Sequence, residues 1–451
     1  MNVIIVGCGR VGTALAMQLS KEGNNITVVD SDSEVVNKLT NECDCMGVIG
    51  NGASHITQQK AGIQEADLLI AVTDSDELNM LCCIVAKREG KCKTIARIRN
   101  HQYLSEIPYL KNELGLAMVI NPEYATAQEI KRVLDFPGAI SIEPFAKGKV
   151  QLLKFKLPEH SAIAGMSIKD IMVKYRSEIL FAIAQRDDDA LILKGDSVIK
   201  GKDIISIIGT PLAQRDFFNK IGYKSGEIKD SLIIGGGEIT HYLAGMLKDS
   251  KISIKVIEED MDICADLSAE YPGLTVVNTS NVDHSTMVDE GLESADSFLA
   301  LTNFDENNIL LSLFAKHSGS KKIITKLKGL SYIDAIPHLD LDAVFSPMKI
   351  TTDMIVRFVR SEKNTRGSNM ENFYNIIPNK VEASEFVISE PSGIVGIPLS
   401  KMKIRDNVLI SAITRDGDVI IPRGNDEIRL GDAVVVVSRS MSLNDITDII
   451  E

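Results

Sequence analysis

Short apolar runs recur along the first part of the chain and are separated by longer amphipathic segments. The runs are four or five residues long and occupy residues 3–6, 26–29, 46–49, 68–72, 94–98 and 117–120. Between them, apolar residues recur at helical spacing, for example at Val11, Leu15 and Leu19. Buried strands that alternate with helices are typical of a parallel sheet covered on both faces. We therefore predict an α/β, Rossmann-like domain over residues 1–138.

A different pattern begins after this domain. Runs such as VQLLKFKL and EILFAIAQR tend toward a period of two residues and are punctuated by Gly, Pro and Asp. This alternation indicates strands with one buried face. One segment, SIKDIMVKY, has the spacing of a short helix. We predict a small α+β module, rich in strands, over residues 139–221.

The whole arrangement is repeated. DLLIAVTDSDELNMLCCIVAK begins at Asp67 and returns as DSFLALTNFDENNILLSLFAK at Asp296, which is 229 residues later. NVIIVGCGRVG likewise returns as SLIIGGGEITH, and GDSVIKGKDIISIIG returns as GNDEIRLGDAVVVVS. A register that is held across different motifs indicates a duplication. We predict a linker at 222–230, a second Rossmann domain at 231–365 and a second module at 366–451.

The bulk properties of the chain narrow its functional class. Its 451 residues suffice for several domains, and its formal net charge of −13 argues against nucleic-acid binding. The seven cysteines lack zinc-ligand spacing and indicate a reducing, cytoplasmic environment. No stretch has the pattern of a membrane helix or a signal peptide. We therefore expect a cytoplasmic protein whose role at a membrane is peripheral.

The first apolar run leads directly into a glycine-rich loop. In such a strand–loop–helix unit, the first glycine makes the turn, the second admits a pyrophosphate, and the third lets helix and strand pack closely. The helix N-terminus presents free N–H groups to the phosphates. The candidate cofactor contacts in this loop are Gly7, Cys8, Gly9, Arg10, Val11 and Gly12. The alternative is that the glycines serve only the packing of the helix on the strand.

Asp30 ends the second apolar run and adds a specificity signal. A carboxylate at this place accepts hydrogen bonds from ribose hydroxyls and repels a 2′-phosphate, so it favours NAD(H) over NADP(H). Its alternative role is to cap the following helix.

The second copy keeps part of this nucleotide-binding pattern. The corresponding candidate contacts are Gly235, Gly236, Gly237, Glu238, Ile239 and Glu258. Thr240 stands where the third glycine is expected, and a β-branched residue there separates helix from strand and weakens phosphate contacts. The second loop therefore either binds a nucleotide or is a decayed site kept as scaffold.

Polar residues also follow the later strands of the first copy. Thr73 with Asp74, Arg97 and Glu123 lie at the carboxyl ends of strands, where open α/β sheets place their ligands. Arg97 either contacts a phosphate or adenine, or forms a surface ion pair. Glu123 either contacts a ribose or a cation, or only lies in the first turn of a helix.

The same region also fits a purely structural interpretation. Asp74 with Glu77, and Asn303 with Glu306 in the second copy, have the spacing of an N-cap and the third helical residue. A capping box would explain these acidic positions without any ligand, but it explains Thr73 less well.

The chain shows no constellation for catalysis. Hydride transfer needs an acid/base residue and a substrate domain beside the nicotinamide, whereas the first Rossmann domain is followed by a β-rich module without such residues. The histidines do not cluster and are expected to be solvated: His55, His101, His160, His241, His284, His317 and His338. We predict a sensor without catalytic residues or a metal site. An NAD-dependent oxidoreductase with duplicated Rossmann lobes is the alternative.

The motifs carry a resemblance to a known family. NVIIVGCGRVG, ITVVD, AVTDSDELNM, IARIRN and INPE, repeated in a chain of two Rossmann domains and two β modules, resemble the TrkA-type regulatory subunits of the Trk potassium-uptake system. The resemblance covers essentially the whole chain. It implies tandem domains that regulate potassium conductance, NAD(H) binding at the loop, Asp30, Thr73, Asp74 and Arg97, and a related response to ATP and ADP.

The resemblance also implies an assembly. Its members form a cytosolic homotetrameric gating ring, peripheral on the inner face of the cell membrane, bound to a Trk-type potassium-translocating membrane subunit. Two departures from the first copy weaken the second site: Thr240, and Met348 at the place of Glu123. Regulation of another cation transporter through the same lobes is a further alternative.

Overall fold

The protein forms two compact units, each built from two distant stretches of the chain. The computed structural model describes residues 1–186, 189–223, 226–280, 282–329, 339, 341–363, 368–377, 380–440, 443 and 445–451. The first unit combines Met1–Lys131 with Ile228–Val356, and the second combines Arg132–Glu227 with Arg357–Glu451. Within the described ranges, no helix has both the length and the apolar character needed to cross a membrane. Two residues of the expected linker, Lys224 and Ser225, lie outside the described residues.

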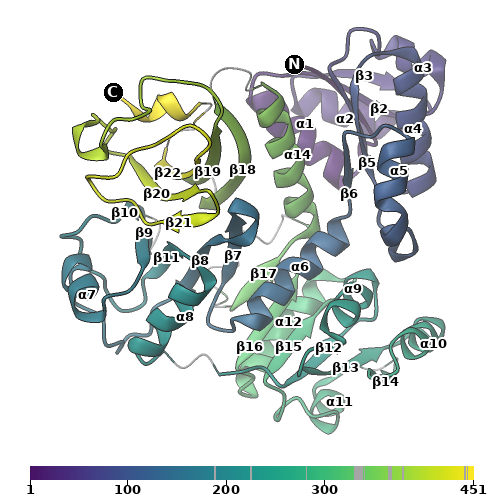
Figure 1. The fold of residues 1–451 in the computed structure, drawn as a ribbon. Helices are drawn as coiled ribbons and strands as arrows, with labels where there is room; N and C mark the ends of the chain where they lie inside the picture. The colour runs from purple at the N-terminus through teal and green to yellow at the C-terminus, as the bar shows by residue number, and fades with distance from the viewer. Residues whose placement is uncertain are drawn as a thin grey trace. The chain divides into compact units, whose positions relative to one another are not determined.

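The first lobe of the first unit contains a six-stranded parallel sheet (Figure 1). Its strands are β1 (Asn2–Val6), β2 (Asn25–Asp30), β3 (Met46–Ile49), β4 (Leu68–Ala71), β5 (Lys93–Arg97) and β6 (Met118–Ile120). Their order, β3-β2-β1-β4-β5-β6, is that of a Rossmann fold and reverses between β1 and β4. The strand pattern read from the apolar runs is confirmed.

Helices connect these strands and cover the sheet. They are α1 (Arg10–Lys21), α2 (Ser33–Glu42), α3 (His55–Lys60), α4 (Asp76–Glu89), α5 (Ile107–Glu113) and α6 (Pro122–Asp135), with a 3₁₀ turn η1 (His101–Glu106). Helix α1 buries a stripe of Leu15, Ala16 and Leu19 against the sheet, whose central strands β1, β4 and β5 are almost entirely buried. The N-terminus of α1 therefore lies at the carboxyl edge of the sheet.

The second lobe repeats this architecture, which confirms the predicted duplication. Its strands are β12 (Asp230–Ile234), β13 (Ser253–Glu258), β14 (Thr275–Asn278), β15 (Ser297–Ala300), β16 (Lys322–Lys326) and β17 (Ala343–Phe345), in the order β14-β13-β12-β15-β16-β17. Its helices are α9 (Glu238–Leu247), α10 (Met261–Glu270), α11 (His284–Asp289), α12 (Asp305–His317) and α14 (Pro347–Lys363).

The second unit consists of two antiparallel sheets. The first contains β7 (Ser141–Phe145), β8 (Val150–Lys156), β9 (Ile179–Arg186), β10 (Asp189–Ile192) and β11 (Ile204–Gly209). The second contains β18 (Ser368–Ile377), β19 (Val381–Ile388), β20 (Val408–Arg415), β21 (Asp418–Ile420) and β22 (Ala433–Arg439). Two helices, α7 (Ile168–Tyr175) and α8 (Pro211–Lys220), accompany the first sheet, and α7 is the short helix that the sequence predicts.

The two sheets of the second unit share a hydrophobic core. Residues from both modules form one buried cluster, in which Phe145 and Ile183 of the first pack with Val435 and Val437 of the second. The ring of Tyr374 meets Phe145 edge to face, and its Oη donates to the Pro144 carbonyl at 3.0 Å. Each module therefore completes the core of the other.

Candidate functional site

The glycine loop of the first lobe has the geometry that its motif predicts. Gly7 adopts a φ of +97°, and a Cβ there would lie 2.9 Å from the Thr73 nitrogen. A Cβ on Gly12 would lie only 1.8 Å from the Gly7 oxygen, so this glycine permits the close approach of α1 to the loop. At Gly9, by contrast, a Cβ would meet no described atom within 4 Å. The space beside Gly9 is therefore open to a ligand.

The carboxylate of Asp30 reaches back to this loop. Its Oδ2 accepts a hydrogen bond from the Cys8 nitrogen at 2.6 Å, and its Oδ1 accepts one from Asp32 at 3.0 Å. Asp32, not Asp30, caps the following helix, because its side chain accepts from the Glu34 and Val35 nitrogens. Burial and the neighbouring Asp30 raise the pKa of the Cys8 thiol to about 12, so this cysteine is neutral.

A cavity of about 820 Å³ opens at the loop and the start of α1. Its wall from the first lobe consists of Cys8, Gly9, Arg10, Thr13, Ala14, Met17, Val35, Lys38, Leu39 and Glu42. Its wall from the second lobe consists of Asn303, Phe304, Asp305, Glu306, Gly329 and Met348. Of the residues predicted to contact a cofactor, only Cys8, Gly9 and Arg10 line this cavity. A molecule bound at the loop would therefore meet both lobes.

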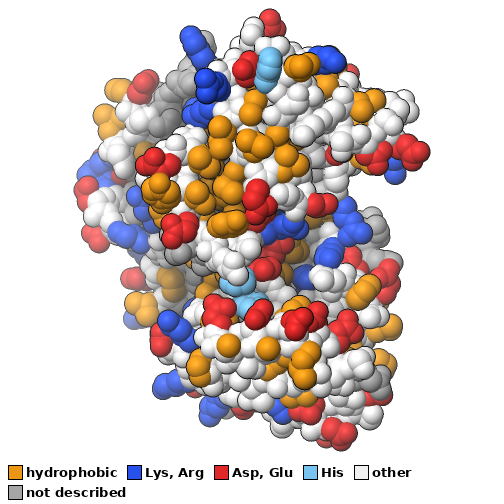
Figure 2. Space-filling view, turned by 90° about the vertical axis from the view of Figure 1, so that its right-hand side faces the viewer, with side chains coloured by type: hydrophobic (Ala, Val, Ile, Leu, Met, Phe, Trp, Pro, Cys, Tyr) orange, Lys and Arg blue, Asp and Glu red, His pale blue; other side chains and the backbone are white. Residues whose placement is uncertain are grey.

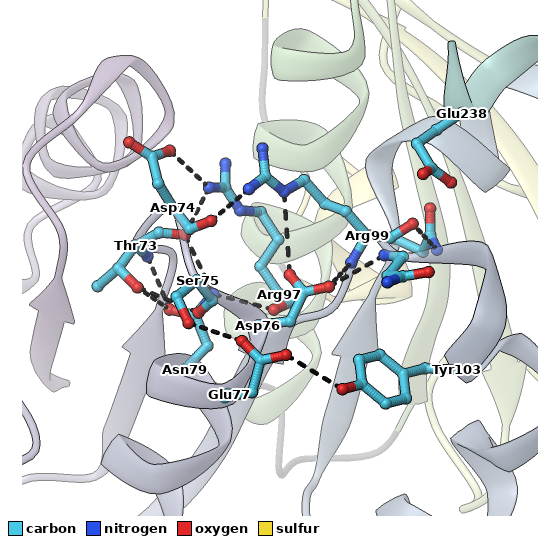
Figure 3. Close-up of polar contacts among 12 residues, drawn as sticks. Thr73, Asp74, Ser75, Asp76, Glu77, Asn79, Arg97, Arg99, Tyr103 and Glu238 are labelled. Carbon is cyan, nitrogen blue, oxygen red and sulfur yellow. Dashed lines mark hydrogen bonds and ion pairs between the residues drawn. The ribbon is translucent and has the colours of Figure 1, made fainter. Parts of the chain in front are cut away.

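Thr73, Asp74 and Arg97 meet at the carboxyl ends of β4 and β5. Figure 3 shows the guanidinium groups of Arg97 and Arg99 side by side, with Asp74 next to them. Arg97 Nη2 donates to the Thr73 carbonyl and, at 3.2 Å, to Asp74 Oδ1. Arg97 is 7% exposed, and burial together with the charge of Arg99 lowers its pKa. Arg97 does form the ion pair of the structural alternative, but its own guanidinium is buried and only its Asp74 partner is exposed.

Two polar residues organise this edge, and their role was not predicted. Asn79 Oδ1 accepts from the Thr73 nitrogen and hydroxyl, both at 2.7 Å, and its Nδ2 donates to the Arg97 carbonyl at 3.0 Å. Asp76 Oδ2 accepts from the Arg99 nitrogen at 2.8 Å. The second lobe repeats both motifs with Asn308 and Asp305. Their return at equal spacing in the repeat was the signal that could have identified them.

The predicted capping boxes are displaced. The N-cap of α4 is Ser75, whose Oγ accepts from the Leu78 nitrogen at 3.2 Å, and not Asp74. In the second lobe the N-cap of α12 is Phe304, which provides no side-chain cap, and not Asn303. The capping interpretation of Asp74 and Asn303 is wrong by one residue, because the turn after each strand is one residue longer than assumed. Asp74 is left facing Arg97.

Glu123 lies in the first turn of α6, as the structural alternative predicts. Burial raises the pKa of its carboxyl, while the nearby charges of Arg99 and Arg97 lower it. Its Oε2 is buried without a hydrogen-bond partner among the described residues. This carboxylate is therefore held beside two cations with an acceptor atom that remains available.

The second glycine loop has a similar backbone but different surroundings. Gly235 has a φ of +107°, and Glu258 accepts from the Gly236 and Glu259 nitrogens as Asp30 accepts from Cys8. The buried Thr240 donates its hydroxyl to the Gly235 carbonyl at 2.6 Å. Its nitrogen bonds to Gly237 at 2.8 Å, three residues back, which tightens the first turn of α9.

Helix α9 also packs against the first lobe. Tyr242 Oη donates to the Arg99 carbonyl at 2.8 Å and accepts from Asn121 Nδ2 at 2.7 Å. Its ring meets Tyr124 edge to face at 5.3 Å. The first-lobe helix α1 borders the cavity at the equivalent position, whereas α9 contacts the other lobe.

The expectation that the histidines stay apart is wrong for one pair. The rings of His101 and His241 stack with centroids 4.6 Å apart and an interplanar angle of 12°. They come from different lobes, and they lie with acidic residues. Figure 2 shows histidine side chains beside acidic ones on one face of the molecule. The packing of one lobe on the other brings them together, which no sequence spacing indicates.

Comparisons with known proteins cover the whole chain. The TrkA-N domain family matches residues 3–122 and 231–347, and the TrkA-C domain family matches residues 383–451. The Trk system potassium uptake protein TrkA homolog 1 of Methanosarcina mazei is 31% identical over 99% of each chain. The Trk system potassium uptake protein TrkA of Halomonas elongata is 30% identical over 97% of this chain and 95% of its own.

Solved structures share the fold. A structure described as the GsuK channel bound to NAD has a TM-score of 0.64 at 17% identity and covers 97% of this chain and 77% of its own. The sequence matches extend over both halves of the chain and agree with the resemblance carried by the glycine loop and the strand ends. The chain belongs to the TrkA family of Trk system potassium uptake proteins.

Proposed function

We propose that the protein is a nucleotide-sensing subunit that regulates potassium uptake through a Trk-type membrane subunit, without converting the nucleotide. The observation that carries this proposal is the cavity at the first glycine loop, because residues of both lobes line it. A ligand that contacts two lobes can favour one arrangement of them over another. The relatives are named as transport proteins and not as enzymes, which favours sensing over the oxidoreductase alternative.

NAD(H) is the nucleotide that the first loop suits best. The loop and the N-terminus of α1 offer N–H groups to a pyrophosphate over residues 7–12, and Arg10 and Lys38 bring positive charge to the cavity. Asp30 would exchange its bond to Cys8 for the ribose hydroxyls. Thr73, Asp74, Arg97 and Glu123 would contact the remainder of the nucleotide. A solved structure of the same fold is described as bound to NAD and another as bound to ADP, so ATP and ADP are the competing ligands.

The second loop, from Gly235 to Ile239 with Glu258, is proposed as a weaker site. Glu238 stands at the first helical position, where the first lobe has Arg10, and a carboxylate there repels phosphate.

The assembly proposed for the chain rests on the resemblance to TrkA-type subunits, and the names of the relatives support only its link to a Trk system. We propose a homotetramer, peripheral on the inner face of the membrane, that binds a Trk-type potassium-translocating subunit. The domain boundaries given in the sequence analysis remain predictions and are proposed together with this assembly.

The test compares nucleotides and two matched carboxylates. We expect the wild-type protein to bind NADH more tightly than NADPH in calorimetric titrations, because Asp30 faces the 2′-phosphate. Asp30→Ala should remove this preference, while Glu258→Ala in the second lobe should preserve it. Equal affinity of the wild type for both nucleotides would refute the assignment of Asp30.

The regulatory step is tested by potassium flux into vesicles that carry the membrane subunit. At saturating NAD(H) we expect flux to change roughly 5- to 150-fold, the range of typical coupling free energies. Asp30→Ala should lose this response and still associate with the membrane subunit, because Asp30 lies at the loop. Flux that ignores every adenine nucleotide, or chemical conversion of the nucleotide during the assay, would overturn the proposal.

A further inference from the structure

A second cluster of polar side chains joins the two Rossmann lobes beside α9, the helix that follows the second glycine loop. His101 begins η1 in the first lobe, His241 lies in α9, and Glu270 ends α10 in the second lobe. One ligand atom from each residue can be chosen so that all three lie within 4.8 Å of one another. His101 Nε2 is 3.8 Å and His241 Nδ1 is 3.4 Å from the same atom, Glu270 Oε2.

The most buried member of this cluster lacks an ordinary partner. His241 is 6% exposed, and its Nδ1 has no hydrogen-bond partner among the described residues, although it points at Glu270. Burial and the neighbouring His101 lower the pKa of His241, while Glu238 and Glu270 raise it. A buried, unpaired nitrogen in a native fold calls for an explanation, and an ion bound at this atom would provide one.

The other two side chains are already oriented as metal ligands usually are. His101 Nδ1 bonds to Glu238 Oε2 at 2.9 Å, which directs its Nε2 toward Glu270. Tyr271 Oη donates to Glu270 Oε1 at 2.8 Å, which leaves Oε2 to face the histidines. Carboxylate and hydroxyl groups that hold the far side of a ligand in this way are typical of metal sites.

We propose that His101, His241 and Glu270 bind a divalent transition-metal ion of the zinc class that ties the two Rossmann lobes together. Two imidazoles and a carboxylate suit zinc better than calcium or magnesium, which prefer oxygen ligands. Donor atoms around a tetrahedral zinc lie about 3.3 Å apart, so the cluster must close by roughly an ångström and the His101 ring must turn out of the stack. The fourth position is open to water. This site shares Glu238 with the second glycine loop and is independent of the nucleotide site proposed at the first loop.

The test is a titration of the metal-free, full-length protein with Zn²⁺ against a competing chelator. We expect one ion per chain and a loss of affinity of about 100-fold in both His101→Gln and His241→Gln. His101 is partly exposed, so its variant should fold even if His241→Gln does not. His55→Gln, which changes an exposed histidine of the first lobe outside the cluster, should bind as the wild type does.

Co²⁺ distinguishes this site from the cysteines. With Co²⁺ we expect visible d–d absorption without the near-ultraviolet band of thiolate ligation, and this absorption should disappear in both cluster variants. Three outcomes would overturn the proposal: no saturable Zn²⁺ binding by the wild type, unchanged binding by both variants, or a thiolate band with Co²⁺.

Discussion

The two Rossmann lobes share a glycine-loop motif, but the helices that follow the two loops have different neighbours. Both loops follow a buried strand, both begin with a glycine at positive φ, and both place a carboxylate against a loop N–H group. The first loop faces a cavity, whereas the helix of the second packs on the opposite lobe through Tyr242. The motif therefore defines the turn, and the packing of the two lobes determines what the following helix contacts.

This difference teaches how a duplicated domain divides its roles. Helix α1 buries Gly12, Leu15, Ala16 and Leu19, whereas α9 buries seven of its ten residues. A helix buried on several sides, such as α9, stabilises an interface between lobes. The residue at the third glycine position of the motif also differs between the lobes: it is Gly12 in the first and Thr240 in the second.

Replacing Gly12 by Thr, or Thr240 by Gly, tests this third position and should produce the largest change in the free energy of unfolding. Gly12→Thr would place a Cβ against the Gly7 carbonyl, and we expect it to lower the free energy of unfolding by about 3–4 kcal/mol. Thr240→Gly loses one hydrogen bond and some helix propensity, so we expect a cost of about 1–2 kcal/mol. Urea unfolding measures both, and equal costs would show that the two loops pack alike.

A larger side chain at the second glycine of the first loop should weaken nucleotide binding without preventing the protein from folding. Gly9→Val adds a side chain where no described atom lies within 4 Å, so we expect a folded protein whose NADH affinity falls by about 100-fold. Gly237→Val is the matched variant, because its position is equally open. Calorimetry should show little change for Gly237→Val. A loss of half the bound NADH in that variant would show that the second loop is an equal site.

Lys326 lies at the strand end that Arg97 occupies in the first lobe. We expect its effect on stability to be smaller and to depend on pH. Burial and the charge of Lys328 lower the pKa of Lys326 to about 8. Between that value and the ordinary lysine pKa of 10.5, the unfolded chain keeps a proton that the folded chain has lost, so this residue makes stability rise with pH. We expect Lys326→Met to stabilise the protein by about 2 kcal/mol at pH 7 and progressively less toward pH 10.

Arg97→Met is the control for this contrast. It should destabilise the protein at pH 7, because Arg97 donates to the Thr73 carbonyl and to Asp74. Unfolding of the wild type and both variants by urea across this pH range measures the effect. A constant difference between the wild type and Lys326→Met from pH 7 to 10 would contradict the assigned pKa.

The sequence predicted the sheets well because their central strands are buried and even the exposed edge strand β3 keeps an apolar run. The run at 94–98 corresponds to β5 at Lys93–Arg97, and the run at 46–49 to β3 without any shift. The roles of the loop glycines could also be predicted, because they depend on backbone geometry within a few residues. Local patterns therefore suffice for the lobes and for the loop of the candidate site.

Features that depend on two lobes at once could not be predicted. The stacking of His101 on His241 joins residues 140 positions apart, and Phe304 reaches the cavity of a loop in the other lobe. No periodicity encodes such contacts, because they follow from how finished domains pack. The displaced N-cap at Ser75 has a smaller cause, since one extra turn residue shifts the start of α4.

The shared core of the second unit has a consequence for synthesis of the chain. Phe145, Leu152 and Ile208 cannot be fully covered until Val435 and Val437 have been made. At typical translation rates of 5–20 residues per second, the intervening stretch takes on the order of ten seconds or more, during which an apolar sheet face of the nascent chain is exposed. The central strand β22 ends twelve residues before the C-terminus, at Arg439. A premature stop just before β22 would therefore remove a late strand and also leave the first module, made long before, without its partner.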